Sequence, residues 1–162
     1  MKDLQKIANE CIAELNAIGI FPAQHIRWNV NTRALTRWGY CRKLDKHFYQ
    51  IEISERLLRD EVPDTATKDT IIHELLHTLP GGMTHAGKWS AAAAKVNRLY
   101  PQYDIKRTAS SEEKGVETVT YKYAVRCTRC GTEYARMRMV KLIQHPELYT
   151  CGACGGTMER IR

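Results

Sequence analysis

The sequence has no run of apolar residues near the roughly 20 that a membrane-spanning helix needs. Its first residues, Met1 to Lys6, also lack the apolar core and the small-residue cleavage site of a secretion signal. We therefore expect a protein of the cytoplasm with no membrane segment. The chain has six cysteines, and four of them form two Cys-x-x-Cys pairs, which in such a compartment point to metal binding rather than to disulfides.

Acidic residues are fewer than basic ones, with 18 Asp and Glu against 25 Lys and Arg and a formal net charge of +7. A balance of this sign favours anionic partners such as nucleic acid. The densest basic segment runs from His25 to Lys46, where arginines alternate with aromatic residues. The predicted nucleic-acid contacts are Arg27, Trp28, Arg37, Trp38, Arg42, Arg126, Arg129, Arg136 and Arg138. For the four arginines near the C-terminus, a plain solvated face is an equal alternative.

Hydrophobic periodicity predicts an α+β core. Apolar residues at three- and four-residue steps indicate a helix over residues 3–17. Three β-rich stretches, 25–30, 38–43 and 48–53, predict a small, antiparallel sheet. A helix then follows Pro63 and ends at Pro80-Gly81-Gly82, and a further helix covers about residues 87–99.

The segment Thr108 to Gly115 is polar and has no large apolar side chain, which is typical of a linker. We therefore divide the chain into three parts. Residues 1–108 form the core, residues 109–116 the linker, and residues 117–162 a small β module.

The helix after Pro63 contains His73-Glu74-Leu75-Leu76-His77. Residues four apart lie on the same side of a helix, so the two imidazoles can meet one metal ion. Glu74 lies about 100 degrees further round, where its carboxylate can hydrogen-bond a water at an open coordination position. As a general base, Glu74 would take a proton from this water and later pass it to the leaving amine. The pattern predicts metal-assisted amide hydrolysis.

A catalytic zinc ion takes three protein ligands, and His85 is the candidate for the third. The two glycines after Pro80 permit the chain reversal that would bring His85 back to the helix. The alternative is an incidental match, but two histidines and a glutamate are costly to bury on an apolar helix without a purpose. Trp89 is expected to be a core residue.

Four cysteines form two pairs, Cys127-x-x-Cys130 and Cys151-x-x-Cys154, separated by 20 residues. This spacing predicts a zinc ribbon, in which two tight turns clamp one tetrahedral ion. Four ligands leave no open position, so this second zinc would be structural. A redox dithiol and two disulfides are the rival interpretations. Cys11 and Cys41 remain as buried thiols.

The chain resembles the SprT-like family of metallopeptidases, which includes a protease of DNA-protein crosslinks. The resemblance is carried by Gly39-Tyr40-Cys41, Ile51-Glu52-Ile53-Ser54, Leu57-Leu58, the motif at 73–77, His85 with Trp89, and the cysteine pairs. One departure is that Ala86 separates His85 from Gly87, where the family tends to place glycine directly after the histidine.

The resemblance implies a zincin-like core, with an N-terminal helix, a small sheet, an active-site helix and a following helix, plus a zinc-ribbon subdomain. It implies that His73, His77 and His85 hold the catalytic zinc, that Glu74 is catalytic, and that Cys127, Cys130, Cys151 and Cys154 hold the second zinc. It also implies a ribbon that contacts DNA, and proteolysis of DNA-bound proteins that is switched on by DNA, especially single-stranded or distorted DNA. We expect a monomer with two zinc ions, and a bacterial or phage version because the chain is short.

Two other functions compete with this hypothesis. A DNA-binding or transcription-linked adaptor would keep the cysteine module, with the histidine site structural or vestigial. A peptide deformylase shares the helix motif but needs a cysteine ligand in an upstream strand. Cys41 lacks the sequence expected around such a ligand.

Overall fold

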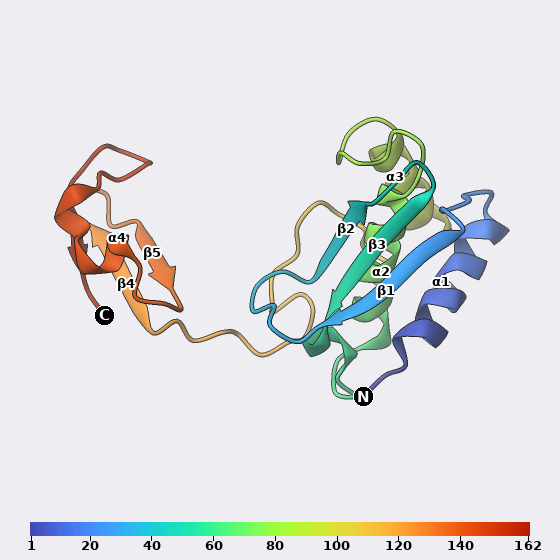
Figure 1. Ribbon diagram of the computed structural model, residues 1–162, viewed down its shortest axis with the longest axis horizontal. Helices are drawn as coiled ribbons and strands as arrows, with labels where there is room; N and C mark the ends of the chain where they lie inside the picture. The colour runs from blue at the N-terminus through green and yellow to red at the C-terminus, as the bar shows by residue number, and fades with distance from the viewer. The chain divides into compact units, whose positions relative to one another are not determined.

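The computed structural model describes residues 1–162 and divides into two compact units, Met1–Thr118 and Val119–Arg162. The first unit carries α1 (Leu4–Ala17), β1 (His25–Asn31), β2 (Gly39–Lys43), β3 (Phe48–Ser54), η1 (Glu55–Leu58), α2 (Asp64–His77) and α3 (Lys88–Leu99) (Figure 1). The second carries β4 (Tyr123–Cys127), β5 (Glu133–Arg136), α4 (Lys141–Gln144), η2 (Pro146–Leu148) and β6 (Met158–Arg160). The α+β class predicted from the sequence is confirmed. No helix is long and apolar enough to cross a membrane.

The first helix, α1, forms where the periodicity predicts it. The side chain of Asp3 accepts a hydrogen bond from the backbone N–H of Lys6, which satisfies a free donor of the first turn. Gly19, with φ +72°, follows the helix and lets the chain turn towards β1. The buried stripe of the helix consists of Leu4, Ala8, Cys11 and Leu15.

The sheet of the first unit has the order β1-β3-β2 and is mixed, whereas the sequence predicted an antiparallel sheet. β2 and β3 form an antiparallel hairpin, but β1 pairs with β3 in parallel. The reason is the order of the strands in the sheet. The connection of residues 32–38 leaves room for one strand between β1 and β2, and β3 then occupies this central position. Periodicity identifies the strands and their faces but does not specify which strands become neighbours.

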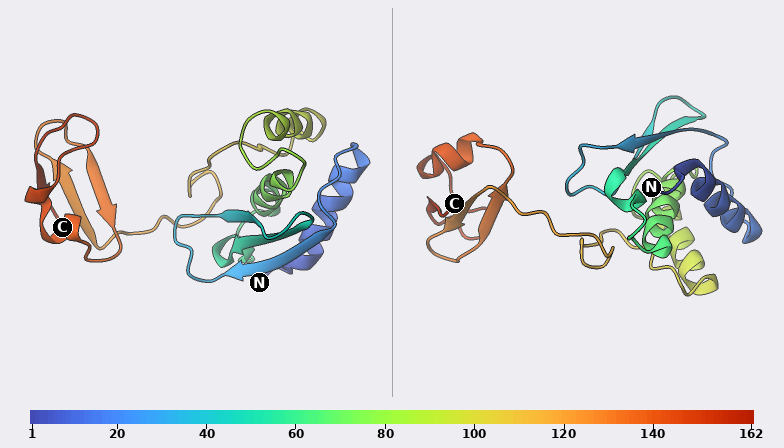
Figure 2. Two further views of the ribbon diagram at one scale, coloured as in Figure 1. Left: turned by 45° about the horizontal axis from the view of Figure 1, so that its top comes forward. Right: turned by 90° about the horizontal axis from the view of Figure 1, so that it is seen from below.

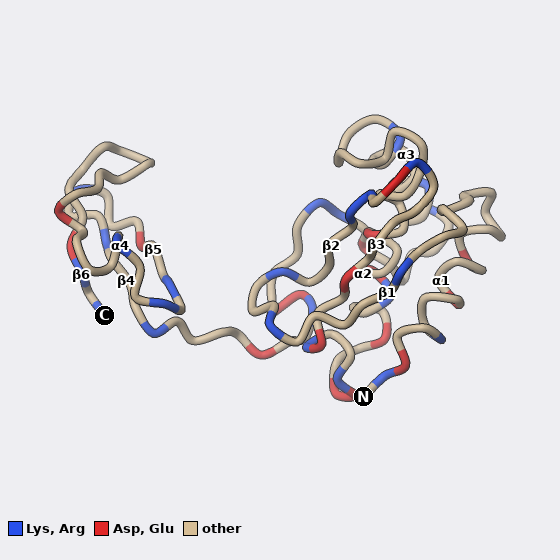
Figure 3. Tube along the Cα trace, in the orientation of Figure 1, with Lys and Arg blue, Asp and Glu red and all other residues tan.

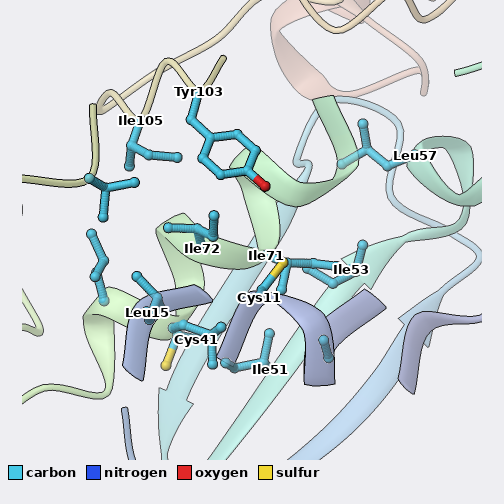
Figure 4. Packing of buried hydrophobic residues seen from close by; sticks show 14 of the residues in the cluster. Cys11, Leu15, Cys41, Ile51, Ile53, Leu57, Ile71, Ile72, Tyr103 and Ile105 are labelled. Carbon is cyan, nitrogen blue, oxygen red and sulfur yellow. The ribbon is translucent and has the colours of Figure 1, made fainter. Parts of the chain in front are cut away.

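The core of the first unit lies between one face of the sheet and the helices α1 and α2 (Figure 2). Cys11 and Leu15 of α1, Ile71 and Ile72 of α2, and Ile51 and Ile53 of β3 meet there (Figure 4). Cys11 and Cys41 are both buried, as predicted, and burial raises the pKa of each thiol to about 12. These two cysteines are inert packing groups at neutral pH.

After α3, the chain returns across the first unit along residues 100–118, and we call residues 104–117 the strap. Tyr103, Ile105 and Val116 are buried in the core, as is the side chain of Lys114. The backbone N–H of Ser110 donates to Glu113 Oε2 at 2.6 Å, and the N–H of Glu113 donates to Ser110 Oγ at 3.2 Å. The sequence predicted a linker at residues 109–116, but this segment lies within the first unit. Although its composition is polar, two of its residues, Lys114 and Val116, are buried.

The second unit is a three-stranded antiparallel sheet of order β5-β4-β6 with the short helix α4. The sequence predicted a small β module here, and the helix α4 was not predicted. Its buried core is small and consists of Val125, Cys127, Ile143, Cys151 and Met158. Two of these five residues are cysteines of the paired motif, so the cysteine cluster is part of the core itself.

Candidate functional site

Three histidines converge on one point in the first unit. The Nε2 atoms of His73 and His77 are 3.3 Å apart, those of His77 and His85 are 3.2 Å apart, and those of His73 and His85 are 3.0 Å apart. A tetrahedral zinc ion about 2.0–2.1 Å from each nitrogen would hold three ligand atoms about 3.3 Å from one another. The triangle therefore has the dimensions of three corners of such a coordination sphere.

The opposite ring nitrogens of the two helical histidines settle which nitrogen carries the proton. His73 Nδ1 lies 3.0 Å from the carbonyl oxygen of Lys106, and His77 Nδ1 lies 2.7 Å from that of Gly82. A carbonyl oxygen only accepts hydrogen bonds, so each Nδ1 must donate and each Nε2 keeps a lone pair. The lone pairs of His73 and His77 that face each other repel unless a cation lies between them, so the donor set fits a metal ion.

Burial supports the neutral, metal-binding form of these rings. It is the main cause that lowers the pKa of His73, to about 4, and the neighbouring rings of His77 and His85 lower it further. Burial also lowers the pKa of His77 and of His85, which is the most exposed of the three. At neutral pH all three imidazoles therefore have nitrogen lone pairs free to bind metal.

The loop between α2 and α3 returns His85 to the helix through two glycines. Gly81 has φ +78°, a conformation that side chains rarely adopt. A Cβ on Gly82 would lie 2.4 Å from the carbonyl oxygen of Leu76, so only glycine fits there. Ala86 stands where the family tends to have glycine. The next residue, Gly87, has φ +54° and directly precedes α3, so it provides the turn into this helix.

Trp89 packs against all three histidines. Its indole is buried and lies 4.7 to 5.7 Å, between ring centroids, from all three imidazoles. Its Nε1–H donates to the carbonyl oxygen of His73 at 3.2 Å. The sequence predicted only a core residue here. Its spacing of four residues from His85 was the one signal that it belongs with the site.

Glu74 is buried beside the histidines, under β2. Burial raises the pKa of its carboxyl to about 8, although the guanidinium of Arg37 and the backbone N–H of Cys41 oppose the shift. A cation held by the histidines would lower this pKa and favour the carboxylate. A Cβ on Gly39 would lie only 2.5 Å from Glu74 Oε1, so the absence of a side chain on β2 makes room for the carboxyl group.

The strap positions the carbonyl group that orients His73. The ammonium of Lys106 pairs with Asp104 at 2.9 Å and with Glu113, and it lowers the pKa of the Glu113 carboxyl to about 2. Lys114 Nζ lies 3.3 Å from the carbonyl oxygen of Ala66 on α2. These contacts hold the strap in place at Lys106 and at Lys114. No sequence signal indicated that the expected linker would lie beside a ligand.

A cleft of about 550 Å³ surrounds the histidines and Glu74. Its walls come from β2 with the loop before it, from α2, from the loop that bears His85, and from the strap. Arg37, Tyr40 and Lys106 are among the residues that line the cleft. The cleft is open to solvent and contains polar groups on several sides.

The four cysteines of the second unit also cluster. Cys127 Sγ lies 3.5 Å from Cys154 Sγ, and Cys130 Sγ lies 3.6 Å from Cys151 Sγ. These distances are far from the disulfide length of about 2.05 Å and near the about 3.8 Å expected around tetrahedral zinc. All four sulfur atoms lie within 4.8 Å of one another.

Backbone N–H groups and a side-chain hydroxyl group lie close to these sulfurs. The backbone N–H groups of Arg129 and Cys130 point at Cys127 Sγ from 3.4 and 3.5 Å. The hydroxyl of Tyr134 is the main cause that lowers the pKa of Cys151, to about 6. At Cys154, the Gly156 N–H favours the thiolate but the sulfurs of Cys130 and Cys127 outweigh it and raise the pKa to about 12. A cation bound by all four sulfurs would favour their thiolate forms, and the closed set of four donors fits a structural ion.

The predicted nucleic-acid residues have different surroundings. Arg27, Arg37 and Arg42 are exposed, whereas Trp28 and Trp38 are half-buried against the core. The Nε1–H of Trp38 donates to the carbonyl oxygen of Ala109 at 3.0 Å. In the second unit the exposed arginines are Arg126, Arg129, Arg136 and Arg138.

The fold of the first unit and the three-histidine site are those of a metallopeptidase-like protein with a potential zinc site. The chain belongs to the SprT-like family, whose family model matches residues 4–109. The match covers the histidines, Glu74 and the start of the strap, and it ends before the cysteine cluster. No curated protein matches the chain.

Proposed function

We propose that this protein is a zinc-dependent metallopeptidase that hydrolyses peptide bonds in DNA-bound proteins. The observation that carries the proposal is the triangle of Nε2 atoms 3.0–3.3 Å apart with the Glu74 carboxyl group in the same cleft. A purely structural metal site has no need of a buried acid beside an open cleft. The four-cysteine cluster would hold a second, structural zinc ion.

The residues of the chain divide the chemistry between them. His73, His77 and His85 would hold the zinc ion, which supplies Lewis-acid activation of a carbonyl group and of water. Glu74 takes the proton of the attacking water and passes it to the leaving amine. A pKa that burial raises to about 8, and that a nearby cation lowers, keeps this carboxyl able to do both near neutral pH.

The strand β2 supports a polypeptide as the substrate. It is an edge strand of the sheet, and its residues Gly39, Tyr40 and Cys41 line the cleft. The backbone groups on the free side of an edge strand can pair with an extended peptide. Such main-chain recognition would impose little sequence preference on the substrate.

The charge of the protein supports DNA-bound substrates. The net charge is +7, and both units expose arginines. Arg27 lies on β1, Arg42 and Lys43 lie on β2, and the loop between these strands carries Arg33 and Arg37 (Figure 3). A protease of this charge would concentrate on DNA, where its substrates lie.

The test incubates the wild type and Glu74→Gln with a basic DNA-binding protein, with and without single-stranded DNA. We expect the wild type to cleave, more rapidly with DNA, and the variant to be inactive while it still binds zinc. Cleavage at the same rate without DNA would leave a general peptidase. No cleavage in any lane, with salt-sensitive DNA binding retained in both proteins, would instead establish the adaptor function.

A further inference from the structure

One face of the sheet in the first unit is not covered by any helix. The helices α1 and α2 pack on the face that presents Tyr49, Ile51 and Ile53 (Figure 2). Successive side chains of a strand point to opposite faces, so the residues between these three belong to the other face. We call this other face the open sheet face, formed by His25, Arg27, Asn29, Tyr40, Arg42, Phe48, Gln50 and Glu52.

The strand register arranges these side chains in rows across the sheet. Arg27 of β1 and Arg42 of β2 both pair with Gln50 of β3, so two arginines flank one amide. Arg42 Nη2 donates to Gln50 Oε1 at 3.0 Å, which holds the guanidinium group over the face. This row presents two fixed positive charges, one on each side of the central strand.

Exposed aromatic rings lie on both sides of the arginine row. On one side Phe48 is 52% exposed and stacks on His25, with the ring centroids 4.9 Å apart. On the other side Tyr40 is 42% exposed, and the guanidinium carbon of Arg37 lies 4.5 Å from its ring centroid. Exposed rings of this size beside guanidinium groups are unusual for a solvated surface and typical of a binding platform.

The one acid on the open sheet face is already paired. Glu52 accepts hydrogen bonds from Asn31 Nδ2 and Gln50 Nε2, both at 3.0 Å, and lies 3.5 Å from Arg37. Neither Arg27 nor Arg42 forms an ion pair, and both side chains are exposed to solvent. The surface is complementary to an anion that also offers flat apolar groups.

We propose that the open sheet face binds single-stranded DNA, with Arg27 and Arg42 on phosphates and Phe48 and Tyr40 stacked on bases. Bases of a single strand are free to stack on exposed rings, whereas bases of a duplex already stack on each other. Trp28 and Trp38 are not part of this platform, because both pack against the core. The inference rests on the proposed function in taking DNA as the anion, and it deepens that function by placing the DNA.

The open sheet face lies next to the cleft that contains the histidines, so DNA bound there could affect proteolysis. Tyr40 lies on the open sheet face, and both Tyr40 and Arg37 also line the cleft around the histidines. DNA on this face would thus run along the rim of the cleft. A polypeptide attached to that DNA would be held next to the histidine site at a high effective concentration.

The experiment measures binding of a fluorescent oligo-dT strand by anisotropy over a range of salt concentrations. All proteins carry Glu74→Gln, so that binding is measured without cleavage. The test variants are Arg27→Ala with Arg42→Ala, and Phe48→Ala. The matched control is Arg59→Ala with Arg98→Ala, which removes the same charge from two exposed positions outside the face.

We expect the Arg27/Arg42 variant to reduce the slope of log K against log salt by about 1.4, or about 0.7 for each phosphate contact. Phe48→Ala should weaken binding at least about fivefold, the loss of one stacked base. The control should bind like the parent. Equal binding by the control and by both test variants would overturn the inference.

A second arm tests the other unit, with Arg136→Ala and Arg138→Ala. If only this variant loses binding, the DNA lies on the second unit and the inference is wrong. Thermal unfolding of each variant checks the fold, and exposed side chains should leave the midpoint unchanged. Because binding is measured without cleavage, failure of the proposed peptidase function would not affect the result, and failure of this inference would leave the cleavage test intact.

Discussion

Gly39 on β2 lies directly against Glu74 on α2: a Cβ on residue 39 would be 2.5 Å from the Glu74 carboxyl oxygen. The relationship joins two segments that are distant in sequence and share the cleft. It explains why a residue with no side chain of its own is required for the position of the proposed catalytic group.

Gly39→Ala should therefore reduce peptidase activity by about 100-fold, because the added methyl group pushes the carboxyl out of place by about 1 Å. Zinc content should stay at the wild-type level, since the histidines are not displaced. Gly152→Ala is the control, because its Cβ would meet nothing closer than 3.8 Å. Activity assays and zinc analysis on the three proteins check this, and full activity of Gly39→Ala would contradict it.

Glu113→Gln should weaken zinc binding at the histidine site by up to about tenfold. Glu113 holds Lys106, whose carbonyl oxygen accepts the Nδ1 hydrogen of His73, and loss of such outer partners lowers metal affinity. Competition with a chromophoric chelator measures the affinity. Glu112→Gln is the matched control, because its carboxylate makes no ion pair in the structure. Equal affinities of the two variants would show that the strap does not support His73.

Cys151→Ser should unfold the second unit and leave the first intact. The core of the second unit has only five buried hydrophobic residues, two of them cysteines of the cluster, so metal binding supplies much of its folding free energy. Limited proteolysis should then digest residues 119–162 while residues 1–118 persist. Ala153→Ser, an exposed change in the same turn, should resist digestion like the wild type. Resistance of Cys151→Ser would mean that the unit folds without its metal.

The stability of the metal-free protein should fall as pH rises from about 4.5 to about 8 through the contribution of Glu74. In this range the folded state retains the Glu74 proton and the unfolded state has lost it, so the unfolded state binds fewer protons. The contribution changes by up to about 1.4 kcal/mol for each pH unit. Denaturant unfolding of the wild type and of Glu74→Gln, both metal-free, isolates it. Identical pH dependence of the two proteins would exclude a raised pKa at Glu74.

The ligand sets could be predicted from the sequence because they depend on local spacing. A four-residue interval on a helix fixes the relative direction of His73 and His77, and the Cys-x-x-Cys interval fixes a tight turn. Glycines 81 and 82 indicated the reversal that returns His85. The apolar stripe of α1 likewise followed from the helical period.

Other features depend on contacts between distant segments. The parallel pairing of β1 with β3, the approach of Gly39 to Glu74 and the inward packing of Lys114 leave no periodic signal in the chain. The basic, aromatic character of residues 25–46 was visible in the sequence, but the strand register decided that Tyr40, like Phe48, faces solvent while Trp28 packs inward.

The sequence by itself determined the helices α1, α2 and α3, the two candidate metal-binding clusters and the charge of the protein, because each depends on residues close together in the chain or on composition alone. The tertiary structure decided the strand order, the support of His73 by the strap and the composition of the open sheet face. These depend on which segments pack together, and packing is selected by the free energy of the whole core rather than by any local interval.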